Sequence, residues 1–510
     1  MRRPRRLPML VLLLAVVIAA VVAERSSTPS TAERLDASMP TARPAGAVGS
    51  TWYCAAGSAT GDANGFAEQS VTITNASDDA VTGTLTAFPD RGEPVTSPLR
   101  VGAHSRQTVR ISEVTRALWA SALVELSGGE VSVAQILQGP AGRAVGACAS
   151  SPAPEWFFPS GSTRNGARNL MALFNPFPGD ATVDLTFDTE DGARTPQQFQ
   201  GLVLRGGRVT VVDVGAVVTL REHVATTVRA RSGRIVAQQI QSSDGREAAE
   251  QGLAVTLGSP VTAPVWSFAV ATPPGSEAHE VISVLNPGDT DATVEVQVQI
   301  DDSAEVGSVE PYRLSVAAGR STTVDLMADA RIPRTAGRWI IVRATEDAPI
   351  VAERCIGEKR GEGAGGLTCT VGVPVLATEW LTSFGDPAWA ATSSLAIANP
   401  TPGVDARVTV TVHGAGGAKD LPNVIEVLVP AGDRLVVDLA AALASRNEAS
   451  VSISSDRPVV LGQLLTTASP VELLTPVVVP VAGTISPIGA VVDPQVAMVV
   501  PEDAPAGSMD

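Results

Sequence analysis

Internal repetition is the feature that most constrains the fold of this chain. The phrase "SVLNPGDTDATVEVQV", which begins at Ser283, has counterparts in "ALFNPFPGDATVDLTF" from Ala172 and "AIANPTPGVDARVTVTV" from Ala396. A fainter copy, "TITNASDDAVTGTLTAF", begins at Thr72. Repetition with a period of about one hundred residues indicates that one domain has been duplicated, so the chain is best interpreted as copies of a single unit.

Three landmarks recur in the same order in these copies. A tryptophan opens each copy, an asparagine that is usually followed by proline comes next, and a Val-Asp pair comes later. The tryptophans are Trp52, Trp156, Trp266 and Trp380; the asparagines are Asn75, Asn175, Asn286 and Asn399; the aspartates are Asp213, Asp325 and Asp438, with Arg110 at that place in the first copy. In the last three copies, 19 or 20 residues separate Trp from Asn, and 38 or 39 separate Asn from Asp.

The local pattern within each copy is that of β-structure. Alternation of apolar and polar residues, as in Val294–Val298, is typical of half-buried strands, and Asn-Pro-Gly favours a turn between two of them. A strand of the type "RPVVLGQLL" closes each copy. Six or seven short strands per copy predict an all-β protein with four tandem immunoglobulin-like antiparallel β-sandwich repeats, joined as a rod. The alternative is a propeller, whose blades have about four strands in roughly 45 residues.

The N-terminus predicts export. Four arginines precede an uncharged apolar run, and cationic residues stay on the cytoplasmic side of a membrane. We predict a basic cytoplasmic tip at residues 1–6, a transmembrane signal-anchor at 7–23 and a flexible Ser/Thr/Ala/Pro-rich linker at 24–50. A signal peptide cleaved after Ala23 is the alternative. The predicted repeats occupy residues 51–150, 151–260, 261–375 and 376–500, followed by a tail at 501–510.

The four cysteines predict disulfide bonds, because an even count in an exported chain is typical of bridges. Three pairings are possible, and we favour Cys54–Cys148 and Cys355–Cys369. The first would join the opening and closing strands of copy one, and the second would close a Gly-rich polar loop. A zinc site would need two close Cys-x-x-Cys pairs or histidine partners, which the sequence lacks.

The charge and the motifs exclude several classes of function. A formal net charge of −16, spread along the chain, does not fit nucleic-acid binding. The sequence contains no nucleophile elbow and no phosphate loop, so we predict no enzyme and no cofactor. An enzyme of unrecognised type would need a polar cleft with perturbed acids between the copies. Turn carboxylates such as Asp289 and Asp291 could hold calcium, although they form no EF-hand loop.

The recurring residues have a structural interpretation. We expect each opening tryptophan to anchor a core or a domain junction, and each Val-Asp aspartate to cap the turn that follows. Trp119 and Trp389 do not recur, so they are the better candidates for contact with a ligand.

The chain resembles a family of uncharacterised actinobacterial proteins with a basic N-terminus, one membrane anchor and tandem extracytoplasmic β repeats, classed as a domain of unknown function. The resemblance is based on "MRRPRR" with the apolar run, the "TWYC" opening, the "EW" openings at Trp156 and Trp380, and the Asn-Pro turns. The resemblance implies a location at the cytoplasmic membrane, with the bulk of the chain outside. It implies no activity.

The expected function is that of a non-catalytic membrane-anchored scaffold or adaptor in the cell envelope. Its partners would be envelope proteins or wall polysaccharide, in addition to the membrane itself. The alternative is a carbohydrate-binding module for envelope polysaccharide, which exposed Trp119 or Trp389 would favour.

Overall fold

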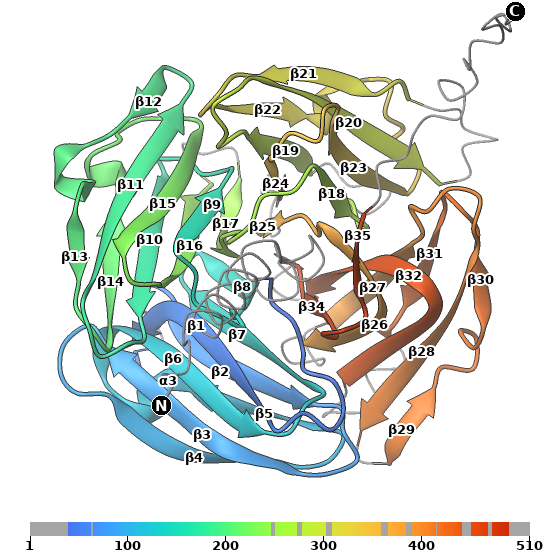
Figure 1. Cartoon of the computed structure of the whole chain (residues 1–510), viewed down its shortest axis with the longest axis horizontal. Coiled ribbons are helices and arrows are strands. Elements are labelled where there is room, and N and C mark those ends of the chain that lie inside the picture. Colours follow the sequence, from blue (N-terminus) through green and yellow to red (C-terminus); the bar gives the residue numbers. More distant parts are fainter. Residues whose placement is uncertain are drawn as a thin grey trace, which may run out of the picture.

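The fold is all-β, as the sequence predicts. The computed structural model describes residues 39–62, 65–245, 250–272, 278–301, 309–358, 366–383, 390–414, 416–440, 450–467 and 472–488. Helix is confined there to single turns between strands. Each sequence copy forms one unit of paired antiparallel sheets, and Figure 1 shows the four units, hereafter repeats 1 to 4, arranged around a common centre.

The strands follow one another in the same order in each repeat. Repeat 1 contains β1 Gly49–Ala59, β2 Glu68–Asn75, β3 Val81–Pro89, β4 Val95–Val101, β5 Ser105–Arg110, α3 Ile111–Val114, β6 Ala117–Ser127, β7 Val131–Gly139 and β8 Gly142–Ala147. Repeat 2 contains β9 Glu155–Phe158, β10 Ala167–Asn175, β11 Ala181–Thr189, β12 Gly192–Arg194, η1 Gln197–Phe199, β13 Leu202–Leu204, β14 Arg208–Asp213, η2 Val214–Ala216, β15 Val224–Ser232, β16 Val236–Asp244 and β17 Gln251–Leu257.

Repeats 3 and 4 have corresponding elements. Repeat 3 contains β18 Val265–Phe268, β19 His279–Leu285, β20 Ala292–Ile300, β21 Tyr312–Val316, β22 Ser321–Asp325, η3 Leu326–Ala328, β23 Arg338–Ala344, β24 Val351–Glu358 and β25 Gly366–Val371. Repeat 4 contains β26 Val375–Ser383, β27 Ala390–Ala398, β28 Ala406–Gly414, β29 Gly417–Asp420, β30 Val427–Val429, β31 Arg434–Asp438, β32 Ser450–Thr467, β33 Leu473–Leu474, β34 Val477–Pro480 and β35 Ile485–Pro487.

Each repeat consists of two sheets, which we call the rim sheet and the hub sheet. In repeat 2 the rim sheet has β12 and β13 beside β11, followed by β15 and β9, and the hub sheet has the order β14-β10-β16-β17. The same pairing recurs in the other repeats, with three exceptions: β1 also pairs with β2, β26 also pairs with β34 and β35, and the long strand β32 belongs to both sheets of repeat 4. Alternate side chains fill the space between the sheets; on β11, Val183, Leu185 and Phe187 are buried.

The strand order differs from that of the immunoglobulin sandwich. In that fold the second strand pairs with the first and fifth, and the last strand joins the opposite sheet. Here β10 lies between β14 and β16, and the opening strand β9 pairs with β15 instead. Period-two alternation predicts that a strand is half-buried, but it does not specify which neighbour the strand takes.

The predicted rod is wrong, because the four repeats form a closed, propeller-like ring (Figure 1). We count the strands as in repeats 1 and 3, so the additional strands β12 and β29 are left out and β32 takes the sixth and seventh places of repeat 4. At every junction the seventh strand of one repeat then packs against the opening strand of the repeat before it: β16 against β1, β24 against β9, β32 against β18 and β7 against β26. The fourth of these contacts joins repeat 1 to repeat 4. Buried apolar clusters cross the junctions, so side-by-side packing removes surface from water that a rod would expose.

An eighth strand in each repeat forms the centre of the ring. Strands β8, β17, β25 and β33 contact one another in sequence, and β33 also contacts β8. Glycines allow this approach: a Cβ on Gly252 would lie 2.4 Å from the Leu367 backbone nitrogen, and one on Gly366 would lie 2.6 Å from that of Leu473. The sequence pattern predicts that the "RPVVLGQLL" strand ends each repeat, so these hub strands were missed.

The segment before repeat 1 closes the ring. Ala42 is fully buried, donates its N–H to Pro480 O at 2.9 Å and accepts from Ala482 N at 2.8 Å. Residues 39–50 therefore belong to the folded ring and not to the predicted linker. The predicted anchor at 7–23 lies outside the described residues, and among the described ones no helix is long and apolar enough to span a membrane.

Candidate functional site

A cavity of about 170 Å³ lies where the four repeats meet. Most of its wall is apolar, with contributions from Val270, Leu461, Val477 and Val479. Its polar lining residues include Arg354 on β24, Cys369 on β25 and Gln463 on β32, together with hydroxyl residues such as Thr256 and Ser267. A mainly apolar hollow with some polar groups in its wall is a usual form of small-molecule site, so we take this partly open hub cavity as the candidate site.

A buried ionic cluster stands beside the hub cavity. Arg354, Arg338 and Glu280 are each at least 98% buried. Arg338 donates from Nε and Nη2 to Glu280 Oε2, at 3.1 and 2.7 Å. Arg354 Nη1 lies 3.7 Å from Glu280 Oε1, and its guanidinium carbon lies 5.5 Å from the centre of the Phe268 ring. Burial, which disfavours the charged form, lowers the pKa of Arg354 from its ordinary value.

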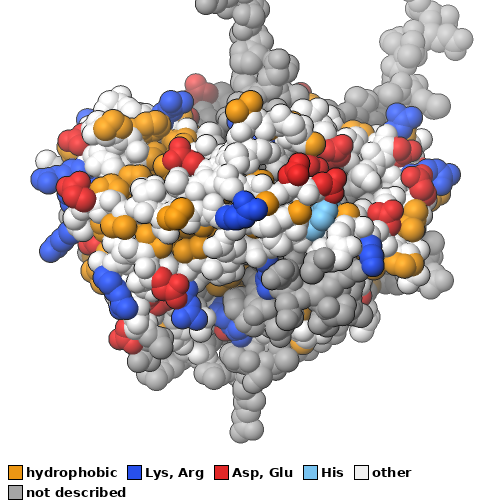
Figure 2. Space-filling model, turned by 90° about the horizontal axis from the view of Figure 1, so that it is seen from below, with side chains coloured by type: hydrophobic (Ala, Val, Ile, Leu, Met, Phe, Trp, Pro, Cys, Tyr) orange, Lys and Arg blue, Asp and Glu red, His pale blue; other side chains and the backbone are white. Residues whose placement is uncertain are grey.

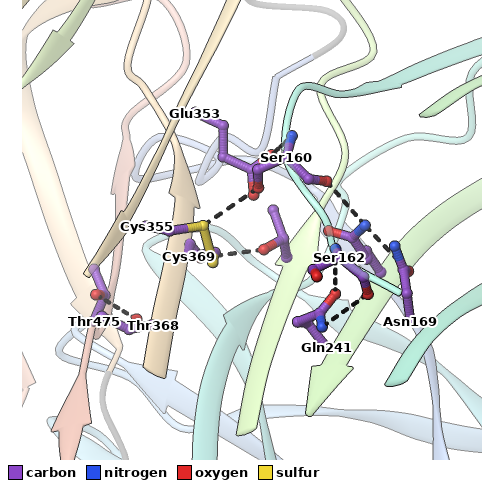
Figure 3. The surroundings of a disulfide bond; sticks show 11 residues. Ser160, Ser162, Asn169, Gln241, Glu353, Cys355, Thr368, Cys369 and Thr475 are labelled. Carbon is purple, nitrogen blue, oxygen red and sulfur yellow. Dashed lines mark hydrogen bonds between the residues drawn. A yellow bond between two sulfur atoms is a disulfide. The ribbon is translucent and has the colours of Figure 1, made fainter. Parts of the chain in front are cut away.

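On the opposite face of β24, Glu353 lies beside a disulfide, as Figure 3 shows. Cys355 and Cys369 are direct partners on the neighbouring strands β24 and β25. The Ser160 backbone N–H donates to Glu353 Oε2 at 3.0 Å, and Ser160 Oγ lies 3.3 Å from Cys355 Sγ. Burial raises the pKa of Glu353 to about 7, and the hydrogen bonds from Ser160 only partly oppose it.

This surrounding does not make a metal centre. Within the described ranges, Glu353, Cys355 and Cys369 are the group of potential ligands close enough to share an ion. Both sulfur atoms are joined in the disulfide, and metals bind the thiolate form of cysteine. The acidic turn residues Asp289 and Asp291 form no such group.

Both predicted disulfides are confirmed. Cys54 is bonded to Cys148, and Cys355 is bonded to Cys369. The first joins β1 to the segment that follows β8, and the second joins β24 to the hub strand β25. Each bridge therefore holds a hub strand, or the residue just after one, to its own repeat.

The four repeated asparagines hold the hairpin turns together. Each side chain is buried, donates from Nδ2 to the backbone of its own turn and to a carbonyl at the end of a neighbouring strand, and accepts an N–H two residues later. For Asn175 these partners are Gly179 O, Leu204 O and Phe177 N, at 2.8, 3.1 and 3.1 Å. Asn75, Asn286 and Asn399 make the equivalent bonds.

The recurring aspartates cap the turns that follow them. Asp213 accepts from Gly215 N, Asp325 from Met327 N and Asp438 from Ala440 N, at 3.1, 2.9 and 2.9 Å. In repeat 1, Arg110 precedes a helical turn without a side-chain cap.

The opening tryptophans Trp52, Trp156, Trp266 and Trp380 are all at most 1% exposed. In repeats 2 and 3, the indole N–H of Trp156 donates to Ile235 O and that of Trp266 to Ile350 O, each at 2.9 Å. These two carbonyls directly precede the seventh strands β16 and β24, so the tryptophans tie the two sheets of a repeat together.

One of the two candidate ligand contacts lies among the described residues. Trp119 is half-buried at the junction of repeats 1 and 2, with its ring 6.0 Å from that of Phe66 and against the cluster that includes Leu170. Trp389 lies outside the described residues. Arg354 and Glu280 at the hub were missed from the sequence, although aligning the repeats shows a charged pair where the other copies have neutral residues.

The comparisons with known proteins give no activity. A family model described as "Family of unknown function (DUF5719)" matches residues 139–365, from the end of repeat 1 into repeat 3. No curated protein matches the chain. Thermotoga maritima 1070 is similar in structure at 20% identity over 22% of this chain and 94% of its own, with a TM-score of 0.19. The Anabaena sensory rhodopsin transducer matches at 33% identity over 18% and 93%, with a TM-score of 0.15. TM-scores this low support no conclusion about the fold.

Proposed function

We propose that this chain is a non-catalytic scaffold or adaptor of the cell envelope, related to the actinobacterial proteins that its motifs resemble. Its N-terminal segment would tether the ring to the cytoplasmic membrane, with the repeats outside. Two disulfides fit an oxidising compartment. The closing segment at residues 39–44 fixes the point at which such a tether would join the ring.

Exposed apolar side chains on the rim carry this proposal. Val203 on β13 and Leu428 on β30 are 56% and 46% exposed. They occupy equivalent places, because the following residues, Leu204 and Val429, pair with the first residues of β11 and β28. Among the described strands, β13 and β30 each pair on one side, and a strand edge with exposed apolar side chains suits contact with another protein. Figure 2, which views the ring from its edge, shows apolar side chains between charged ones.

Site-specific cross-linking in envelope membranes tests this role. A photoreactive residue at position 203 or 428 of the full-length chain should cross-link the same envelope protein. An excess of the parent chain without the probe should compete the product away, whereas an excess of the Val203→Asp, Leu428→Asp double variant should not. The matched control is position 315, because Ser315 is the exposed equivalent on β21 of repeat 3. Equal products at position 315, or none at 203 and 428, would contradict an adaptor that uses the rim.

The alternative role in polysaccharide binding is tested by the same chain. Purified wall polysaccharide should not retain the adaptor. Because Trp119 packs between repeats 1 and 2, it has little free ring face for stacking on a sugar. Retention on the polymer that is lost in Trp119→Ala would favour a carbohydrate-binding module and count against the adaptor.

A further inference from the structure

Each repeat buries one polar pair between its second and seventh strands. The first member lies six residues before the repeated asparagine, and the second lies diagonally across on the seventh strand, two positions from the residue directly opposite the first. The neutral pairs are Gln69–Gln135, Asn169–Gln239 and Ser393–Gln463, with hydrogen bonds of 2.9, 3.2 and 2.9 Å. In repeat 3 the equivalent residues are Glu280 and Arg354, so a charged pair replaces two neutral side chains.

A second arginine gives this cluster more positive than negative charge. Arg338 on β23 engages the same carboxylate of Glu280 and also donates to Thr272 Oγ1. Two guanidinium groups therefore share one carboxylate in the interior. Arg354 Nε and Nη1 and Arg338 Nη1 are buried without a hydrogen-bond partner among the described residues.

The neighbouring carboxylates do not supply the missing charge. Asp301 is held by Arg434, with two bonds of 2.7 Å, so that pair is neutral by itself. The side chain of Glu353 lies on the opposite face of β24, where its carboxylate accepts a hydrogen bond from the Ser160 N–H. One positive charge is thus left uncompensated among the described groups, and a buried charge without a partner is strongly unfavourable.

The hub cavity is the place where a counter-charge can bind. Arg354 lines it, and the surrounding wall is formed largely by Val270, Leu461, Val477 and Val479. We propose that the hub cavity binds a small organic monoanion, whose carboxylate pairs with Arg354 and whose compact apolar body fills the rest of the space. One negative charge balances the cluster, and a carboxylate matches the planar guanidinium.

The size of the cavity limits the ligand. Its volume of about 170 Å³ is close to that of an engineered apolar cavity of about 150 Å³ that binds benzene. A monocarboxylate with a branched or single-ring body fits this space, whereas a polysaccharide does not. This site is separate from the rim, so it does not depend on the proposed adaptor role.

Calorimetric titration of the full-length chain in chloride-free buffer tests the proposal. The probes are acetate, isobutyrate and benzoate at millimolar concentrations, with benzamide as the neutral analogue of benzoate. Isobutyrate or benzoate should bind, and benzoate should bind at least about tenfold more tightly than benzamide, because hydrogen bonds to charged groups are the stronger ones. Arg354→Gln should weaken benzoate binding by at least about tenfold.

The variants separate a specific site from a general effect of charge. Glutamine is the residue that repeats 1, 2 and 4 have at this place, so Arg354→Gln is expected to fold. The control Arg313→Gln removes an exposed arginine of the same repeat and should bind benzoate as the parent does. Three outcomes would overturn the proposal: none of the acids binds, benzoate and benzamide bind the parent equally, or Arg354→Gln binds benzoate unchanged. The comparison of benzoate with benzamide uses the parent alone and decides the question even if Arg354→Gln fails to fold.

Discussion

Asn175 shows how one side chain can fix a hairpin at both ends. Its amide donates to Gly179 O within the turn and to Leu204 O on the neighbouring strand, while its carbonyl accepts from Phe177 N. The sequence predicts the turn, since Asn-Pro ends a strand. The bond to Leu204 could not be predicted, because it depends on a strand that begins more than twenty residues later.

Replacing this side chain should be costly. Asn175→Ala leaves the buried Leu204 carbonyl without its partner, together with the exposed Gly179 carbonyl and the half-buried Phe177 N–H, and we expect a loss of about 1–3 kcal/mol in the free energy of unfolding. Urea denaturation followed by tryptophan fluorescence measures it. Asn423→Ala, at an exposed turn position, is the control and should change stability by less than about 0.5 kcal/mol. A loss of similar size in both variants would argue against the role of the Asn175 hydrogen bonds in holding the hairpin together.

Glu353 should make stability depend on pH. Its pKa is raised from 4.5 to about 7, so the folded chain holds this proton more tightly than the unfolded chain does. Its contribution is therefore full below pH 4.5 and is lost as the pH rises to 7, by an amount on the order of 3 kcal/mol. Glutamine stays neutral, and repeat 2 has Gln238 at the equivalent place, so Glu353→Gln should be more stable than the parent above pH 7 and similar below pH 4.5.

Urea denaturation at a series of pH values checks this expectation for Glu353. Glu125→Gln, which alters an exposed carboxylate on β6, is the matched control and should leave the pH profile unchanged. Parallel profiles for Glu353→Gln and the parent would show that the Glu353 carboxyl is not the source of the pH dependence of stability.

At the scale of the elements, the strands that can be predicted are those with one buried face. Strand β20 alternates buried and exposed residues along its length, and its sequence shows the same alternation. The hub strands do not: β8 and β25 are short, contain glycine and have neighbours in other repeats. Their sequences therefore resemble links between domains. These strands are recognised by their close contacts with other repeats, and a local sequence pattern carries no information about such contacts.

The glycines of the hub strands give a prediction for these elements. Gly252→Ala would place a methyl group 2.4 Å from the Leu367 backbone nitrogen, so β17 and β25 would have to separate. We expect a loss of about 1–3 kcal/mol in the free energy of unfolding. Gly179→Ala is the control, because a Cβ there meets nothing within 4 Å. Thermal unfolding of both variants tests the prediction, and equal melting temperatures would contradict tight packing at the hub.

At the scale of the whole molecule, the ring could not be predicted although its repeats could. Spacing and alternation describe what happens inside one repeat, whereas closure depends on the angle between successive repeats. That angle is set by contacts such as Gln238 Nε2 to Ala56 O and Ser160 N to Glu353 Oε2. The hub cavity could not be predicted for the same reason, because it forms only where the four repeats face one another.

A histidine pair at the closing junction gives the molecule a second dependence on pH. His104 Nδ1 and His413 Nδ1 lie 3.1 Å apart across repeats 1 and 4, with Asp78 on His104 and Ser452 on His413. Burial, together with His104, lowers the pKa of His413 from 6.5 to about 4, and the charges of Asp78 and Asp420 only partly oppose this shift. The contribution of His413 is thus full above pH 6.5 and is lost as the pH falls to 4, by an amount on the order of 3 kcal/mol.

Between pH 4.5 and 6.5 the effects of His413 and Glu353 oppose each other, so the parent should show a nearly flat profile. His413→Asn should gain stability relative to the parent as the pH falls from 7 to 4.5, because the contribution of Glu353 is then no longer opposed by that of His413. Denaturation across this range measures the difference in slope, and the double variant with Glu353→Gln should lose this gain. A His413→Asn profile that follows the parent would rule out this opposition.

The pairing of Ala42 with Val481 sets the order in which the protein can be completed. Val481 follows Ala42 by 439 residues, and both must be present before the ring closes. At a synthesis rate of roughly 5–20 residues per second, Ala42 waits between about 20 and 90 seconds for this partner. During that interval the surface that carries Ala42 and Thr74 stays open to water and to other chains, because their partners on repeat 4 are still to be made. Newly made chains therefore pass through a period in which the incomplete ring can pair with a second copy, and faster synthesis shortens it.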